Sequence, residues 1–416
     1  MPTPTPWPVK RLFPLLATVG LILIGMASTT WWGPHLAGNS AWALPLDLWG
    51  TLAAAQRLLH LDLSGLYTQP TGLVSFPGTA LILVPVVALI DAAGISLRWP
   101  GVQNTHPAAW LLAGPYEMAL SALALFAADA VADRLGVTRP KRAFLAGAEA
   151  VAVWSVSVKW GHPEDAVAVG LLLYGIVALA DSRPERAAWY MGAAVAVQPL
   201  VLLALPVVLV VVPRRLLGFL TRSAAPSALL LGAAASANWT ATFHAVTSQP
   251  NSPSINHATP WTSLAPRISN DVLAAGPSRA LAIVAACACA LVVRHGWRGR
   301  HGAAWSPDAL EEIVWWCGVS LALRSIFEIV MAPYYLWPVL AVALIVGSKS
   351  WRRLLVTALA VTAVTFVSQL TWRGSLWSWW TPMVVGTVLI LFLARLPLHK
   401  GALQPHSRMM DVGTHL

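Results

Sequence analysis

The sequence predicts an all-α polytopic membrane protein, and three observations support this fold class. Of the 416 residues, 57% are hydrophobic and 11% are charged, whereas soluble domains carry about 25% charged residues. The apolar residues form long runs, several of which approach the ~20 residues that a helix needs to cross a bilayer. The basic residues gather at the ends of these runs. We therefore expect a bundle of about 10–12 transmembrane helices in the plasma membrane.

The first apolar run, Leu12–Trp32, follows Lys10 and Arg11 and has no clear small-residue cleavage site. We interpret it as a retained first helix and not as a signal peptide. In chain order, the other runs expected to cross lie at 108–132, 144–159, 166–180, 224–241, 272–293, 310–330, 335–347, 354–369 and 381–393.

Two further apolar runs are interrupted. Phe76–Ile95 contains Pro85, and Ala187–Val212 contains Gln198–Pro199 in its middle. If the first run crossed fully, several basic loops would fall on the wrong side. We therefore expect it to be an interfacial helix in the first outer loop. We expect the second run to be a broken element that either crosses twice as two short helices or dips into the membrane and returns.

The net charge of +10 comes from 27 basic and 17 acidic residues. With the N-terminus in the cytoplasm, 20 of the 27 basic residues lie on the cytoplasmic side. The charge excess therefore indicates topology and membrane-lipid partners, and not a nucleic-acid partner. We expect one domain over residues 1–400, a cytoplasmic tail at 401–416 and both termini in the cytoplasm. The cysteines Cys287, Cys289 and Cys317 all lie in apolar runs, which favours buried thiols over a metal or redox site.

Function is therefore expected on the extracytoplasmic side, where two long loops lie. Asp47 follows the first span closely and precedes a helix-like pattern that ends in "GLY" at Tyr67. A carboxylate at this rim could take a proton from a hydroxyl near the lipid headgroups. A solvated loop aspartate is the competing interpretation, and the spacing alone favours it.

A polar turn, "GHPED", joins two apolar runs and contains His162, Glu164 and Asp165. Pro163 and the two acids suit the start of a helix. A helix start does not need a histidine and two carboxylates, however, and ionisable groups at membrane depth are usually functional. No cofactor is required by the pattern. Together with Asp47 these residues could also hold a divalent metal, although their spacing is not diagnostic.

Arg324 and Glu328 are four residues apart within the run 310–330. They could form an internal pair on one helix face, or Arg324 could bind a phosphate with its guanidinium fork. Arg267 in the second outer loop is another phosphate candidate. The weaker candidates are Arg57, Lys159, His257 and Arg279. Most of the 22 tryptophans are expected in interfacial belts.

Several segments together resemble the GT-C membrane glycosyltransferases, and most closely the actinobacterial polyprenol-phosphate-mannose-dependent mannosyltransferases. They are the first loop with Asp47, "AAAQRLL", "GLY" and "FPGTALILVPVVAL", then "GHPEDAVAVGLLLYGIVAL", "AAWYMGAAVAVQPLVLLALPVVL", "NHATPWTSLAPR" and "APYYLWPVLAVALIV". The likeness extends over most of residues 10–350. The chain departs from the family at His162, where glutamine is usual, at Gln198, where lysine is usual, and at "FPGT", where the first loop usually has "YPP".

The resemblance implies a GT-C-like bundle that transfers a sugar, with mannose or arabinose as candidates, from a polyprenyl phosphate to a lipid or glycan acceptor with inversion. It implies Asp47 as the catalytic base. Substrate-binding candidates are Tyr67, His162, Glu164, Asp165, His257, Arg267, Arg324 and Glu328. Two alternatives stay open: a transporter or flippase, which would have charged residues near the bilayer midplane and an inverted repeat, and a non-catalytic membrane scaffold.

Overall fold

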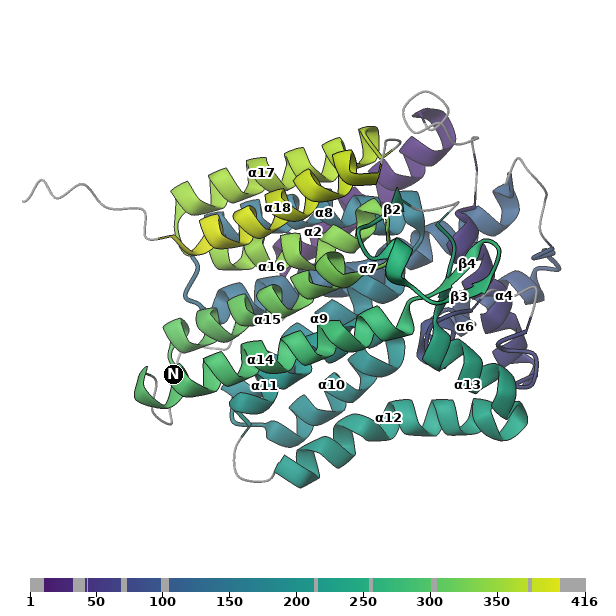
Figure 1. Ribbon diagram of the computed structural model, residues 1–416. Coiled ribbons are helices and arrows are strands. Elements are labelled where there is room, and N and C mark those ends of the chain that lie inside the picture. Colours follow the sequence, from purple (N-terminus) through teal and green to yellow (C-terminus); the bar gives the residue numbers. More distant parts are fainter. Residues whose placement is uncertain are drawn as a thin grey trace, which may run out of the picture.

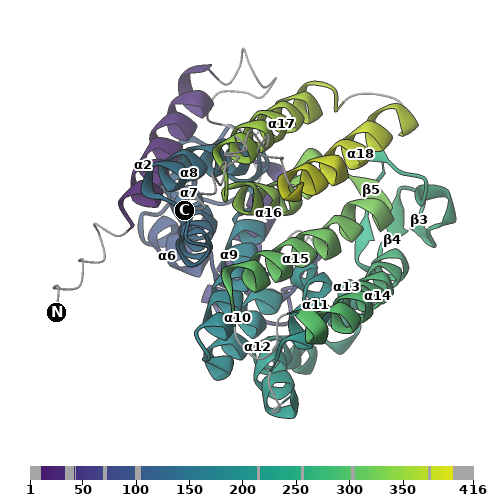
Figure 2. The ribbon, with the colours of Figure 1, turned by 90° about the vertical axis from the view of Figure 1, so that its left-hand side faces the viewer.

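The computed structural model is a bundle of helices with short helices and two small sheets at one end (Figure 1). It describes residues 11–32, 42, 44–68, 73–98, 105–212, 216–253, 257–300, 305–372 and 376–396. The predicted tail, 401–416, and Lys10 lie outside these residues. A view turned by 90° shows α9 and α15 inside the bundle, with α2, α12 and α18 at its periphery (Figure 2).

The helices are, in chain order, α2 (Leu12–Ala27), η1 (Ser28–Trp32), α4 (Leu46–Leu59), α5 (Pro77–Leu81), α6 (Val84–Ala92), α7 (Pro107–Arg134), α8 (Arg139–Trp154), η2 (Ser155–Trp160), α9 (Pro163–Ala180), α10 (Pro184–Val197), η3 (Pro199–Leu203), α11 (Leu205–Val210), α12 (Leu216–Ala237), α13 (Trp239–Ser248), η4 (Thr262–Leu264), α14 (Gly276–Arg300), α15 (Pro307–Phe327), η5 (Pro333–Leu336), α16 (Trp337–Gly347), α17 (Trp351–Leu370) and α18 (Leu376–Arg395). The strands are β1 (Pro250–Asn251), β2 (His257–Ala258), β3 (Arg267–Ser269), β4 (Val272–Ala274) and β5 (Val330–Met331).

Six helices of the described chain are long and apolar enough to cross a bilayer: α2, α7, α9, α12, α14 and α17. Two shorter apolar helices span Pro333–Gly347 and Ser378–Leu393. Large apolar side chains are exposed on the outer helices α12, α14 and α17, for example Leu229, Leu281 and Leu359, as expected of surfaces that face lipid. The fold is that of a mainly helical, polytopic membrane protein.

The two interrupted runs are broken into shorter helices, as the sequence predicts, and their positions relative to the membrane stay predictions. The first forms α5 and α6, of five and nine residues. At 1.5 Å per residue neither helix can span a bilayer. The second breaks at Gln198, whose backbone is extended (φ −150°, ψ 114°) between α10 and η3. Because proline cannot donate a backbone hydrogen bond, Pro199 ends the ladder of α10 at this point.

Three predicted boundaries are wrong. The run predicted at 224–241 ends at Ala237, because Asn238 caps a separate helix, α13, by accepting a hydrogen bond from the Ala241 amide. The second outer loop is therefore partly helical. The run predicted at 272–293 begins with a strand, β4, before α14. The run predicted at 310–330 ends at Phe327, so Glu328 is extended and not on the helix.

The sheets are small and antiparallel. One has the order β1-β4-β3, and the other pairs β2 with β5, with His257 opposite Met331. The β2–β5 pairing joins segments far apart in the chain, and strands of two or three residues leave no periodic pattern in the sequence. They fix the second outer loop against the end of α15.

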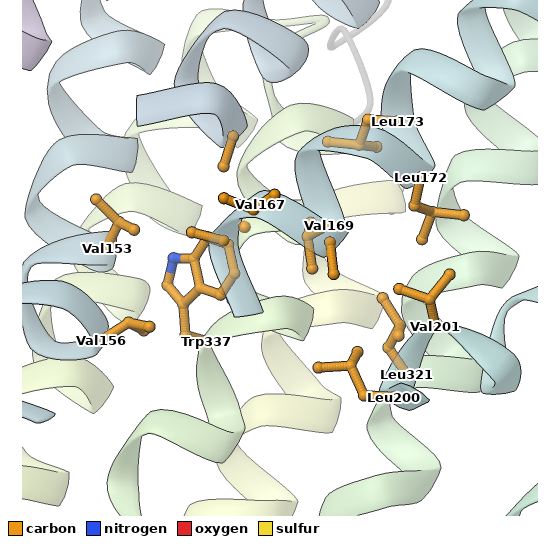
Figure 3. Close-up of a cluster of buried hydrophobic side chains, with 14 of the residues drawn as sticks. Val153, Val156, Val167, Val169, Leu172, Leu173, Leu200, Val201, Leu321 and Trp337 are labelled. Carbon is orange, nitrogen blue, oxygen red and sulfur yellow. The ribbon is translucent and has the colours of Figure 1, made fainter. Parts of the chain in front are cut away.

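The core lies around α9, whose buried side chains include Val167, Val169, Leu172 and Leu173 (Figure 3). Helix α9 is apolar and buried on almost all sides, as expected of a central helix. Side chains from α8, η3, α15 and α16 surround it, namely Val153, Leu200, Val201, Leu321 and Trp337. The first turn of this rigid helix carries Glu164 and Asp165.

The basic loops meet at one end of the bundle. Arg142 at the start of α8 makes two hydrogen bonds of 2.7 Å to Asp129 near the end of α7. Arg11 also pairs with Asp129. Lys349, between α16 and α17, pairs with Asp308 at the start of α15. The basic residues Arg11, Arg142 and Lys349 therefore lie at the same end of the bundle, and their cytoplasmic location stays a prediction.

Candidate functional site

At the other end of the bundle, a histidine lies between two carboxylates. Nδ1 of His162 is 2.6 Å from Oε1 of Glu164, and Nε2 is 3.0 Å from Oδ2 of Asp47. The side chains of Glu164 and His162 are 5% and 13% exposed, whereas that of Asp47 is 51% exposed. Asp47 is therefore the member of this triad that an incoming molecule can reach.

The local sequence explains how Asp47 and His162 meet. Gly161 ends η2 in the left-handed conformation, at φ 68°, which glycine adopts without strain. A Cβ at this position would lie 2.7 Å from Cβ of Leu48. The turn is thus packed directly against the start of α4. Pro163 then begins α9, so His162 stands between the two helix starts.

The two carboxylates determine the charge of His162. Burial of the ring opposes protonation, but Glu164 and Asp47 outweigh burial and raise the pKa of His162 well above its ordinary value. An imidazolium has two N–H donors, and each points at one carboxylate here. His162 can therefore hold Asp47 in a fixed position as a charged hydrogen-bond donor.

A second polar cluster lies next to the first in the chain and contains Asp165. Its side chain is fully buried and accepts a 2.7 Å hydrogen bond from Nε2 of Gln198, in the broken element. Nη1 of Arg324 lies 3.6 Å from Oδ2 of Asp165, and neither of these two atoms has a hydrogen-bond partner. The guanidinium also lies over the Tyr335 ring, at 4.0 Å.

This cluster borders a small cavity of about 70 Å³. Glu328 pairs with Arg324 at 3.8 Å even though it lies beyond the end of α15, and it pairs with Arg279 of α14 at 2.9 Å. Arg279 also donates to the side chain of Gln249. The cavity lining combines two guanidinium groups and the single carboxylate of Glu328 with apolar side chains such as Phe327 and Leu203. Such a lining suits an anionic group attached to an apolar chain.

The first outer loop is tied to the broken element. The Tyr67 hydroxyl donates to the carbonyl of Ser75, and the Ser75 hydroxyl donates to Oε1 of Gln198. Thr79 donates to the carbonyl of Val197. Tyr67 is thus linked through Ser75 and Gln198 to Asp165.

Aromatic rings join the outer loops above the site. Tyr334 stacks on His162 at 4.0 Å and meets Tyr335 edge-on at 4.6 Å. Trp160 lies 5.5 Å from Tyr334 and 5.1 Å from Trp372. His257 lies 5.5 Å from the same Trp372 and stacks on Trp379 at 5.2 Å. This aromatic row connects His257 to the triad.

Most of the predicted residues thus lie in one connected region. Asp47, His162 and Glu164 form the triad. Asp165, Arg324 and Glu328 form the second cluster, and Tyr67 and His257 are connected to these two groups through neighbouring side chains.

Arg267 lies apart from this region. It is exposed on β3 and makes no ion pair within the described part of the chain. No group of three or more His, Cys, Asp or Glu that could hold a metal occurs among the described residues.

Three contributors to the site, and one further buried acid, lie outside the predicted set of site residues. Tyr334 and Tyr335 were recognised only as a motif, and Gln198 only as the position of a break. Glu117 is fully buried inside α7, and neither of its carboxylate oxygens has a hydrogen-bond partner. An acidic residue within an apolar run is itself a sequence signal of function, so Glu117 could have been found.

No protein-family model matches the chain, and no curated protein is detectably similar to it. Its function must therefore be inferred from the site.

Proposed function

We propose that the protein is a membrane glycosyltransferase that uses a polyprenyl-phosphate sugar, with mannose as the first candidate, and a lipid or glycan acceptor on the extracytoplasmic face. One observation carries the proposal. Asp47, the "GHPED" turn, Gln198 of the broken element, Arg324 and the Tyr334–Tyr335 pair come from five distant segments and form one connected polar and aromatic region. These are segments that resemble the GT-C enzymes.

In this proposal Asp47 takes the proton from the acceptor hydroxyl. The acceptor oxygen then bonds to the anomeric carbon while the bond from that carbon to the phosphate oxygen breaks, and the polyprenyl phosphate leaves with inversion. Arg324 and Arg279 hold the phosphate and stabilise its charge as it departs. His162 keeps Asp47 oriented toward the acceptor.

A transporter is the second candidate function, and two buried carboxyl groups favour it. Glu117 in α7 and Glu149 in α8 are buried well inside the bundle, and transporters place ionisable groups on their substrate or proton paths. The exposed carboxylate of Asp47 beside a buried histidine suits surface chemistry better, and so we favour transfer.

The test is transfer of radiolabelled mannose from polyprenyl-phosphate mannose to endogenous lipid acceptors in membranes. Asp47→Asn keeps the shape of the side chain but cannot take a proton, so we expect label incorporation to fall about 10²- to 10⁴-fold. Asp271→Asn, an exposed outer aspartate, is the matched control and should retain wild-type transfer.

Undiminished transfer in Asp47→Asn would show that Asp47 is not the base. If the wild-type protein transfers neither mannose nor arabinose, the glycosyltransferase proposal fails and transport becomes the leading candidate.

A further inference from the structure

A second polar surface lies on the opposite side of α4 from Asp47. Trp49, Gln56, Arg57 and His60 lie on one face of this helix and line a groove of about 800 Å³. Two residues along a helix correspond to a turn of about 200° around its axis. Asp47 and Trp49 therefore point in nearly opposite directions, so the groove is separate from the triad.

The other wall of the groove is the end of α6 and the segment after it, with Asp91, Ser96 and Arg98. Hydrogen bonds hold the two walls together. Nε1 of Trp49 donates to the carbonyl of Leu97 at 2.7 Å, and Nε2 of Gln56 donates to Asp91 at 3.4 Å. The volume falls within the range of about 300–1,000 Å³ that ligand sites occupy.

The charges of the groove are balanced. Asp62 pairs with Arg57 at 2.5 Å, and Asp91 lies 3.4 Å from Nε2 of His60. An anion site would need cations in excess, and a metal site would need carboxylates free of cations. Neither condition holds here: the two arginines of the lining, Arg57 and Arg98, are matched in number by Asp62 and Asp91, and each of these carboxylates already faces a cationic or imidazole group.

The remaining chemistry suits an uncharged molecule with many hydroxyls. Hydroxyl groups both donate and accept, and the groove offers donors from Gln56, Arg57 and Arg98 and acceptors from Asp91 and Asp62. The indole of Trp49, which packs partly against the core and is held by its hydrogen bond to Leu97, contributes apolar surface to the lining among these polar groups. Aromatic faces flanked by such donors and acceptors match the alternating apolar and hydroxylated surfaces of a sugar ring.

We propose that the groove between α4 and α6 binds a short neutral oligosaccharide. The assignment rests on the lining of the groove and not on sugar transfer at Asp47. A glycan held there would keep a carbohydrate chain at the surface on the far side of the helix that carries Asp47.

The test uses the full-length protein in lipid nanodiscs, labelled with 5-fluorotryptophan. Comparison with Trp49→Phe identifies the fluorine resonance of Trp49. The probes are mannotriose, maltotriose, galactotriose, glycerol phosphate and inorganic phosphate. We expect at least one trisaccharide to shift the Trp49 resonance saturably, and we expect the two phosphates to leave it unchanged.

Asp91→Asn should weaken that binding at least tenfold, because the amide loses acceptor capacity, while Asp271→Asn should not change it. Asp47→Asn should also bind the trisaccharide normally, so failure of the transfer proposal would leave this one intact. A Trp49 resonance that no trisaccharide shifts, or that only the phosphates shift, would overturn the proposal. So would undiminished binding in Asp91→Asn.

Discussion

His162 precedes α9, but its side chain does not cap this helix. Its ring nitrogens face Glu164 and Asp47, and its plane stacks on Tyr334. The GT-C enzymes that the sequence resembles usually have a glutamine at this position. A glutamine would keep one hydrogen bond but could not carry a positive charge, so the histidine adds a charge that glutamine lacks beside the proposed base.

This charge makes the stability of the protein depend on pH. The pKa of His162 is raised in the folded state by Glu164 and Asp47, against the effect of burial. Its contribution to the free energy of unfolding is therefore present in full below the unfolded pKa, about 6.5. It declines as the pH rises toward the folded pKa and is absent above it.

We expect the melting temperature of the wild type to exceed that of His162→Gln most at pH 5.5–6.5, and the difference to shrink steadily as the pH is raised to 10. Thermal unfolding of both proteins in the same detergent measures this. His244→Gln, which changes an exposed histidine on α13, should show no such trend. A difference that grows with pH would contradict the charged state assigned to His162.

At the scale of elements, the site depends on the close contact between the η2–α9 turn and the start of α4. Gly161 permits this contact in two ways, because its φ of 68° suits glycine and a Cβ would meet Leu48. The contact places His162 against Asp47, which is 115 residues away in the chain. Local packing of two helix starts thus creates the triad.

Gly161→Ala tests this dependence. We expect a loss of stability of about 1–3 kcal/mol from the left-handed backbone, together with a further loss and a drop in mannose transfer because the methyl group pushes the turn away from Leu48. Gly136→Ala is the matched control, since Gly136 has φ 72° but nothing within 4 Å of a Cβ. Its variant should carry only the backbone strain. Equal effects of the two substitutions on transfer would show that the contact does not position His162.

The elements also show what the sequence could predict. Hydrophobic run length and proline position sufficed for the six long apolar helices, for the interruption between α5 and α6, and for the break at Gln198, because these depend on local composition. The strand pair β2–β5 and the extended Glu328 could not be predicted, because tertiary contacts between distant segments create them. The residue types of the site were recognisable, but the pairing of Asp47 with His162 needed the fold.

Across the whole molecule, the two ends of the bundle differ in chemistry. One end holds the basic loops, where Asp129, Arg142 and Lys349 take part in ion pairs. The other end holds the triad, the aromatic row and the groove. Because basic loops tend to stay in the cytoplasm, the proposed function places the site on the extracytoplasmic face, and this orientation is a prediction.

Cysteine labelling in intact cells tests that orientation. In a background with alanine at 287, 289 and 317, single cysteines are introduced as Thr138→Cys in the basic end and Ser269→Cys on β3, both at exposed positions. A membrane-impermeant maleimide should label Ser269→Cys in intact cells, and should label Thr138→Cys only after the membrane is opened. The reverse pattern would place the triad in the cytoplasm and would exclude an extracytoplasmic polyprenyl-phosphate sugar as its donor. Labelling of both in intact cells would mean that Thr138 does not lie on the cytoplasmic side, so the basic end could not be used to orient the bundle.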